Sequence, residues 1–174
     1  PAEPALETII SGKYAMIDLW HEPSAADRRA ARAILKRIEC LHLANRPWAQ
    51  ISQGERQRAL IGRALMAKPK LLMLDEPCAG LDPVAREHFL QFLDRLGQQR
   101  NSPSIILITH HTEEIMPVFT HALLIRDGRN LAQGPVKEIL NDEALSRVFG
   151  SPVQLSRKQG RYWLTTKTKR NSVM

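Results

Sequence analysis

One pattern constrains the fold of this chain more than any other: two short apolar runs separated by a helix. LLML at residues 71–74 and IILI at residues 105–108 have the length of strands and are apolar on both faces. Residues 82–97 between them show helical periodicity, with Asp82 as N-cap and Pro83 at the first helical position. A helix that joins two fully buried strands makes a βαβ crossover, so the sequence predicts a parallel sheet and an α/β fold.

Two helices are expected before this unit. Residues 24–41 are predicted to form a helix that starts at Ser24 and has an arginine-rich outer side. Its expected buried positions are Ala30, Ile34, Ile38 and Leu41. A second helix is predicted from Ser52, which stands in capping-box register with Glu55, to the residues before Pro69. Its expected buried positions are Ala59, Leu60, Ala64 and Leu65.

Hairpins and short helices are expected after the crossover. Residues 122–125 have strand character, and the Asp127–Gly128 pair predicts a hairpin turn with residues 129–132 returning. Residues 135–149 are typical of a short helix pair, and residues 153–166, with Gly160 at the turn, of a terminal hairpin.

Composition excludes several classes of protein. With 43% hydrophobic and 25% charged residues, the 174-residue chain is globular rather than disordered. Its longest aliphatic runs are four residues, too short to cross a bilayer. The net charge of +7 lies mostly in residues 151–174, which hold six basic and no acidic side chains, against 19 and 18 in residues 1–150. The larger part of the chain therefore gives no case for nucleic-acid binding.

Three short segments combine residue types that can act on a phosphate. Asp75 and Glu76 follow the first predicted strand, at the end where α/β sheets place their ligands. Carboxylates at this position could bind Mg²⁺ and activate a water molecule. The alternative is an acid pair that faces solvent in a loop. His110 follows the neighbouring strand and is expected close to Glu76, although a core or capping role is the alternative for such a histidine. Residues 52–54 are expected at the start of a helix, where free backbone amides favour the binding of an anion. The alternative is an ordinary capped helix start that binds no ligand.

Taken together, these segments resemble the ATP-binding cassette (ABC) ATPases over about residues 8–140. ISQGE is similar to the family's signature motif, and LLMLDEP is similar to its Walker B strand with the following glutamate. Residues 79–82 are similar to the D-loop, and His110 to the switch histidine. The resemblance implies an ABC-type P-loop NTPase, in which a helical subdomain accompanies a parallel-sheet core with helices on both faces and C-terminal β-hairpins.

Two family elements have no counterpart in these residues, the Walker A loop and the Q-loop. The Gly12–Lys13 pair is followed by Tyr14 and lacks an earlier glycine at the required spacing. With Pro1 as first residue, this predicts that the chain is the C-terminal part of a cassette and is inactive by itself.

The resemblance implies ATP and Mg²⁺ as cofactors, with two ATP molecules held between two cassettes. In such a pair Asp75 would hold Mg²⁺, Glu76 would act as general base, and His110 would contact the γ-phosphate.

The resemblance assigns a second set of residues to the partner's nucleotide. Ser52, Gln53 and Gly54 would bind the γ-phosphate held by the other cassette, and Asp82 would help to seal the dimer. Glu55 stands where the family usually has glutamine, so its role toward the nucleotide stays open.

The function expected from the resemblance is that of the ATPase subunit of a membrane transporter. It would work at the cytoplasmic face of the membrane with a second cassette and a separate permease chain, and nucleic acid is not expected as a partner. Residues 1–50 would be part of the helical subdomain, residues 51–140 the ATPase core, and residues 141–174 a C-terminal helix and basic hairpin tail.

Two other functions fit the same motifs. A soluble ABC ATPase acting on nucleic acid or ribosomes would use the basic tail as a phosphate contact. A non-catalytic regulatory domain would keep the fold without the chemistry.

Overall fold

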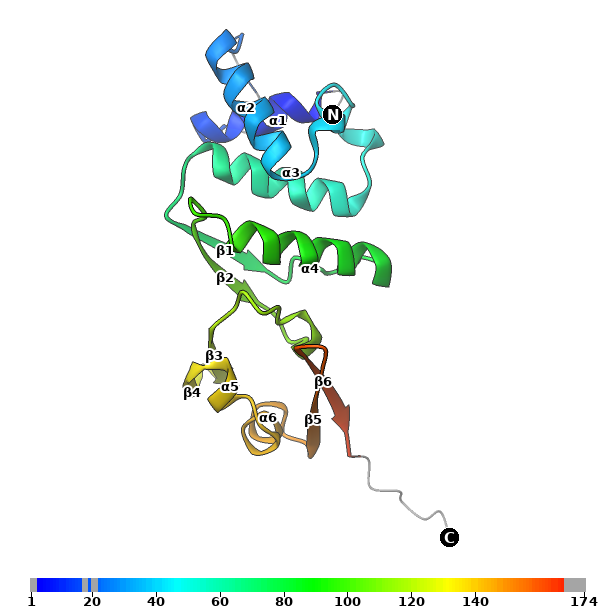
Figure 1. The fold of residues 1–174 in the computed structure, drawn as a ribbon, viewed down its shortest axis with the longest axis vertical. Helices are drawn as coiled ribbons and strands as arrows, with labels where there is room; N and C mark the ends of the chain where they lie inside the picture. Colours follow the sequence, from blue (N-terminus) through cyan, green and yellow to red (C-terminus); the bar gives the residue numbers. More distant parts are fainter. Residues whose placement is uncertain (1–2, 17–18, 20–21, 168–174) are drawn as a thin grey trace. The chain divides into compact units, whose positions relative to one another are not determined.

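The computed structural model describes residues 3–16, 19 and 22–167, and the chain divides into two compact units, Pro1–Ile108 and Thr109–Met174 (Figure 1). Pro1, and Lys169 and Arg170 of the basic tail, lie outside the described residues. The expected division into residues 1–50, 51–140 and 141–174 stays a prediction.

The first unit contains four α-helices and a two-stranded sheet among its described residues. The helices are α1 (Ala5–Ser11), α2 (Ala25–Arg37), α3 (Gln53–Met66) and α4 (Pro83–Gly97). Short 3₁₀ turns are η1 (Gly12–Tyr14), η2 (Leu41–Leu43) and η3 (Trp48–Gln50). The strands are β1 (Leu71–Asp75) and β2 (Ser104–Ile108).

Helix α3 lies between α1 and α2 on one side and α4 on the other (Figure 1). The helices pack through fully buried side chains such as Ile9 of α1, Leu35 of α2 and Ala59 of α3. A methyl group added at Gly62 would lie 2.6 Å from Ile38 Cδ1, so a glycine is needed where α3 passes the end of α2.

The start of α2 is fixed by a buried carboxylate. Asp27 accepts hydrogen bonds from Lys13 Nζ at 2.6 Å, Tyr14 Oη at 2.9 Å and Ser24 Oγ at 2.6 Å. The hydrogen bond from Lys13, followed by that from Ser24, holds the pKa of Asp27 well below its usual range. This cluster connects η1 to the N-terminus of α2, where Ser24 and Asp27 form a capping box.

The buried stripes of α2 and α3 differ from those predicted. Helix α2 buries Ala31 and Leu35, and the predicted Ile38 just after the helix is buried as well, whereas Ala30 is exposed and Leu41 lies beyond the helix end. In α3 the predicted Ala59 and Leu65 are buried, but Leu60 is 43% exposed. Alanines occur on several faces of these helices, so the sequence pattern is compatible with burial of more than one face. Packing against the other helices decides which face is buried.

The βαβ crossover is confirmed. Strands β1 and β2 pair in parallel from Leu71–Ser104 to Asp75–Ile108, and α4 connects them. Leu72 of β1 is buried, whereas Met73 on the opposite face is 60% exposed. The expected α/β fold is thus present, with its strands ending at Asp75 and Ile108.

The second unit consists of two hairpins and short helices. Its elements are η4 (Thr112–Glu114), β3 (His121–Arg126), β4 (Arg129–Pro135), α5 (Val136–Ile139), α6 (Asp142–Phe149), β5 (Val153–Lys158) and β6 (Arg161–Thr166). The predicted turn at Asp127 and Gly128 is confirmed, since both residues have positive φ, +50° and +71°. A core of Val136, Leu140, Leu145, Val153 and Tyr162 holds the helices on the hairpins.

Among the described residues, no helix combines the length and the apolarity that a bilayer crossing requires.

Candidate functional site

The acid pair lies where β1 ends. Asp75 is the last residue of β1, and the Glu76 amide donates to Ile108 O at 2.9 Å, which continues the pairing with β2 by one residue. Both side chains are exposed. Glu76 has a φ of +42°, a conformation that is uncommon for a residue with a side chain and that recurs at functional positions.

The chain turns from β1 into α4 through residues 76–82. Ala79 N donates to Glu76 O at 3.0 Å, and Leu81 N donates to Cys78 O at 3.1 Å. Asp82 then caps α4, because its Oδ1 accepts from Val84 N at 2.9 Å and Ala85 N at 3.0 Å. The predicted N-cap is confirmed, and it occupies one oxygen of Asp82.

The predicted capping box at the start of α3 is also confirmed. Ser52 Oγ accepts from Glu55 N at 3.4 Å, and Glu55 Oε2 accepts from Ser52 N at 2.9 Å. Ser52 and Gln53 are exposed, and Gly54 is half-buried.

A hydrogen bond brings these two segments together. Gln53 Nε2 donates to Ala79 O at 3.2 Å, and a methyl group added at Gly54 would lie 3.8 Å from Ala85 Cβ. A methyl group on Gly80, which has a φ of +74°, would lie 2.9 Å from Gln53 Nε2. Three of the predicted binding residues, Gln53, Gly54 and Asp82, therefore belong to one surface made by the starts of α3 and α4.

His110 belongs to the second unit and follows β2 in the chain. Its ring lies 4.1 Å from the ring of His111, measured between centroids. His111 Nδ1 is 3.2 Å from Glu113 Oε1, and Thr109 Oγ1 accepts from His111 N at 3.0 Å. The expected proximity of His110 to Glu76 stays a prediction.

One contact at this surface has no signal in the sequence. His42, in η2, places Nε2 3.1 Å from Glu55 Oε1. Burial tends to raise the pKa of Glu55, but the hydrogen bonds from His42 and Ser52 outweigh it and lower that pKa to about 2. Neither motif nor periodicity connects positions 42 and 55, because a loop folds η2 back on α3.

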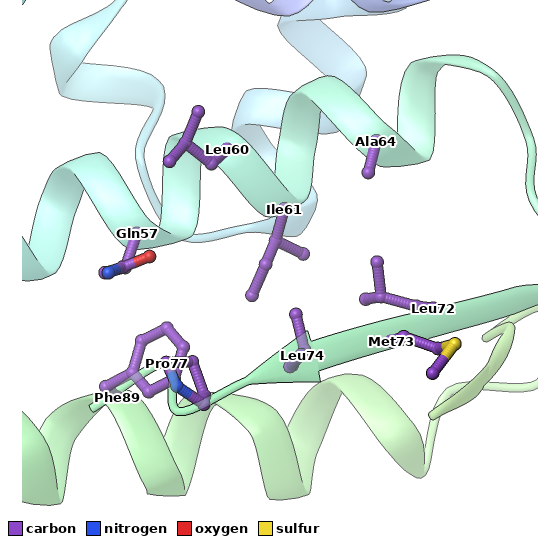
Figure 2. Close-up of a pocket in the computed structure, with 9 residues that line it drawn as sticks. All are labelled: Gln57, Leu60, Ile61, Ala64, Leu72, Met73, Leu74, Pro77 and Phe89. Carbon is purple, nitrogen blue, oxygen red and sulfur yellow. The ribbon is translucent and has the colours of Figure 1, made fainter. Parts of the chain in front are cut away.

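The hollow between α3, β1 and α4 is not part of this surface. It has a volume of about 200 Å³ and is lined mainly by apolar side chains (Figure 2). Ile61 of α3 points toward Leu74 of β1, with Phe89 of α4 beside them (Figure 2). Because none of the predicted site residues lines it and it offers few hydrogen-bond donors, it is unsuited to a phosphate.

Comparison with known proteins gives a consistent result. The family model described as "ABC transporter" matches residues 4–79. The chain is 46% identical over 165 residues to the uncharacterized ABC transporter ATP-binding protein YlmA of Bacillus subtilis, covering 95% of this chain and 62% of that protein. These comparisons support an ABC ATPase nucleotide-binding domain, to which the chain is similar over most of its length.

Further relatives agree with this finding. YmeB of Lactococcus lactis, also an uncharacterized ABC transporter ATP-binding protein, is 35% identical over 90% of this chain and 60% of its own length. An inward-facing structure described as a metal-chelate type ABC transporter has a TM-score of 0.81, 26% identity and coverage of 97% of this chain and 68% of that one. The chain thus spans about three fifths of the length of these two relatives.

Proposed function

We propose that the complete protein binds and hydrolyses ATP as the ATPase subunit of an ABC membrane transporter. Two cassettes would hold ATP between them, and a permease would be a separate chain. The subunit would work in the cytoplasm on the inner face of the membrane.

The hydrogen bond from Gln53 to Ala79 is the observation that supports this proposal most. It joins the start of α3 to the turn that leads from Asp75 and Glu76 into α4. The start of α3, where the helix dipole favours an anion, therefore borders the same surface as this turn, as expected for a face that meets a nucleotide held by a second cassette. The similarity to ABC transporter ATP-binding proteins supports the same assignment.

The residues divide into two roles. Glu76 would polarise the attacking water as general base, and His110 would contact the γ-phosphate. Ser52, Gln53 and Gly54 would bind the γ-phosphate of the nucleotide on the partner, next to Asp82 at the dimer contact. In a twofold pair each of these residues acts twice.

Asp75 fits one ligand position of Mg²⁺. Among the residues that the structure describes, no three His, Cys, Asp or Glu side chains gather around a common point. Mg²⁺ at a phosphoryl-transfer site needs only one or two carboxylates, because phosphate oxygens and water complete its shell. Asp75, exposed at the end of β1, would hold the ion directly or through water, and the ion would neutralise charge on the phosphates.

Glu76→Gln in the full-length protein tests the proposal. The amide cannot accept the proton of water, so we expect ATP binding to persist while hydrolysis falls at least about 100-fold. Phosphate release and nucleotide binding are measured together. Glu138→Gln, at an exposed position of α5, is the control that leaves turnover unchanged. Full turnover in Glu76→Gln would rule out the general-base role.

Ser52→Arg tests the contact with the second cassette. A long cation at the exposed start of α3 would obstruct a second cassette, so we expect ATP-dependent dimers of the Glu76→Gln protein to disappear in sedimentation experiments. Ser151→Arg, exposed in the second unit, is the matched control. Undiminished dimerisation in Ser52→Arg would contradict the role of α3 at the interface.

A further inference from the structure

Both oxygens of the Glu55 carboxylate are occupied at the start of α3. Oε2 accepts from Ser52 N at 2.9 Å and from Ser52 Oγ at 2.8 Å. Oε1 lies 3.1 Å from His42 Nε2. The carboxylate therefore competes for the Ser52 hydroxyl that, in the proposed function, donates to a phosphate.

Glu55 also brings a negative charge to a helix start that otherwise favours an anion. Its side chain is only 18% exposed, so solvent screens this charge incompletely. A phosphate arriving at residues 52–54 meets like-charge repulsion from Glu55 unless a cation balances it.

His42 is positioned to supply that cation. Its side chain is 55% exposed, and histidine as a residue type changes its charge between about pH 5 and pH 8. The imidazolium neutralises Glu55 and weakens the hold of its carboxylate on the Ser52 hydroxyl.

The other charged groups of this region are engaged elsewhere. Glu39, after α2, is held by Arg95 Nε at 2.7 Å and lies 4.0 Å from Arg58 of α3. Arg56 of α3 donates to Ala49 O at 3.1 Å. Burial raises the pKa of the nearby Cys40 thiol to about 11, so it stays neutral near pH 7. Among these groups, His42 contacts Oε1 of Glu55, the oxygen that does not bond to Ser52.

We propose that His42 is a positioning residue for the start of α3. Its protonation strengthens the binding of residues 52–54 to the terminal phosphate of an ATP molecule held by a second cassette. The inference rests on the proposed function. Protonation of His42 makes the ATP-dependent pairing of cassettes tighter at low pH, although His42 itself touches no nucleotide.

The experiment measures ATP-dependent self-association of the full-length Glu76→Gln protein by sedimentation at about pH 6 and about pH 8. His42→Ala removes the cation, and His42→Lys keeps a positive charge at both pH values. His88→Ala, exposed on α4, is the control for a histidine elsewhere. Because ATP itself titrates in this range, variants are compared with the parent at each pH. Thermal unfolding verifies that each variant is folded.

We expect His42→Ala to weaken association roughly three- to tenfold at the lower pH and much less at the higher pH. His42→Lys should keep the tight association at the higher pH, and His88→Ala should follow the parent. In a Glu55→Gln background the difference between His42 and its alanine variant should vanish.

Two results overturn the inference while leaving the proposed function intact. One is the same pH dependence in His42→Ala as in the parent, and the other is no gain of His42→Lys over His42→Ala at the higher pH. If the parent does not associate with ATP at either pH, the proposed function is overturned and this inference with it.

Discussion

Backbone conformation at single residues shapes the surface around the acid pair. Glu76 has a φ of +42° and Gly80 one of +74°, so the turn from β1 to α4 contains two left-handed residues within five positions. At Gly80 the side chain of Gln53 fills the space that a Cβ would need. Glycine is therefore favoured there by its conformation, and an added Cβ would displace the end of the Gln53 side chain.

Gly80→Ala should be more destabilising than its φ alone predicts. A left-handed alanine costs about 1–2 kcal/mol, and displacing Gln53 forfeits its hydrogen bond to Ala79, worth about 1 kcal/mol. Urea denaturation measures the loss. Gly128→Ala is the matched control, because Gly128 has a φ of +71° and no atom within 4 Å of an added Cβ. The predicted contact between Gln53 and an added Cβ would be contradicted if both variants lost the same free energy of unfolding and if Gly80→Ala were no less destabilising in a Gln53→Ala background.

At the scale of elements, an ion pair connects the end of α2 to α4. Arg95 donates to both oxygens of Glu39, with Nε at 2.7 Å and Nη2 at 2.8 Å, and Glu39 has a φ of +60° just after α2 ends. Arg37 adds a hydrogen bond to Gln99 at 2.7 Å. These contacts hold α2 against the far end of α4, while Gln53 joins α3 to its near end.

A double-mutant cycle with Glu39→Gln and Arg95→Gln should give a coupling energy of about 0.5–1 kcal/mol, because the geometry is bidentate although the pair is partly exposed. The hydrogen bonds from Arg95 lower the pKa of Glu39, so the coupling is present at neutral pH and is lost as the pH falls below about 4. Urea denaturation at both pH values measures it.

The control for this cycle is the pair Arg28–Glu22. Its atoms are 4.0 Å apart and the Glu22 side chain is 91% exposed, so its coupling should be close to zero. A coupling at Glu39–Arg95 no larger than that of the control would show that this contact does not fasten α2 to α4.

At the scale of the whole molecule, the predicted site residues are shared between two compact units. Asp75, Glu76 and the starts of α3 and α4 belong to the first, and His110 to the second. The net charge of +7 is also uneven, with the basic excess in residues 151–174 beyond the predicted site.

The 174 residues by themselves should bind ATP weakly. Their sequence holds no G-x-x-x-x-G-K-[ST] loop, and the exposed Asp75 and Glu76 repel phosphate. Calorimetry of the 174-residue chain with MgATP should therefore show no micromolar binding, whereas the full-length protein should bind. Micromolar affinity of the chain alone would mean that other residues cradle the phosphates.

Local sequence patterns determined much of this protein. The helix start at Ser24, the capping box at Ser52, the N-cap at Asp82, the turn at Asp127 and the parallel pairing of the two apolar strands were all predictable, because each depends on residues close in sequence or on the apolar strand–helix–strand pattern. The expected burial of both strand faces was wrong, since Met73 is 60% exposed. The motif order likewise indicated the family. These features depend on the hydrogen bonding of backbone groups at helix starts and turns and on the size and polarity of neighbouring side chains. Both are determined by residues within a short segment.

Only the tertiary structure decided which helix faces are buried and which residues distant in sequence come into contact. Helix α2 buries Ala31 rather than Ala30, because its stripe is chosen by packing against α1 and α3. The contacts of Gln53 with Ala79, of His42 with Glu55 and of Glu39 with Arg95 join positions 26, 13 and 56 residues apart. Such pairs are selected by the path of the loops between elements, and no local propensity encodes that path.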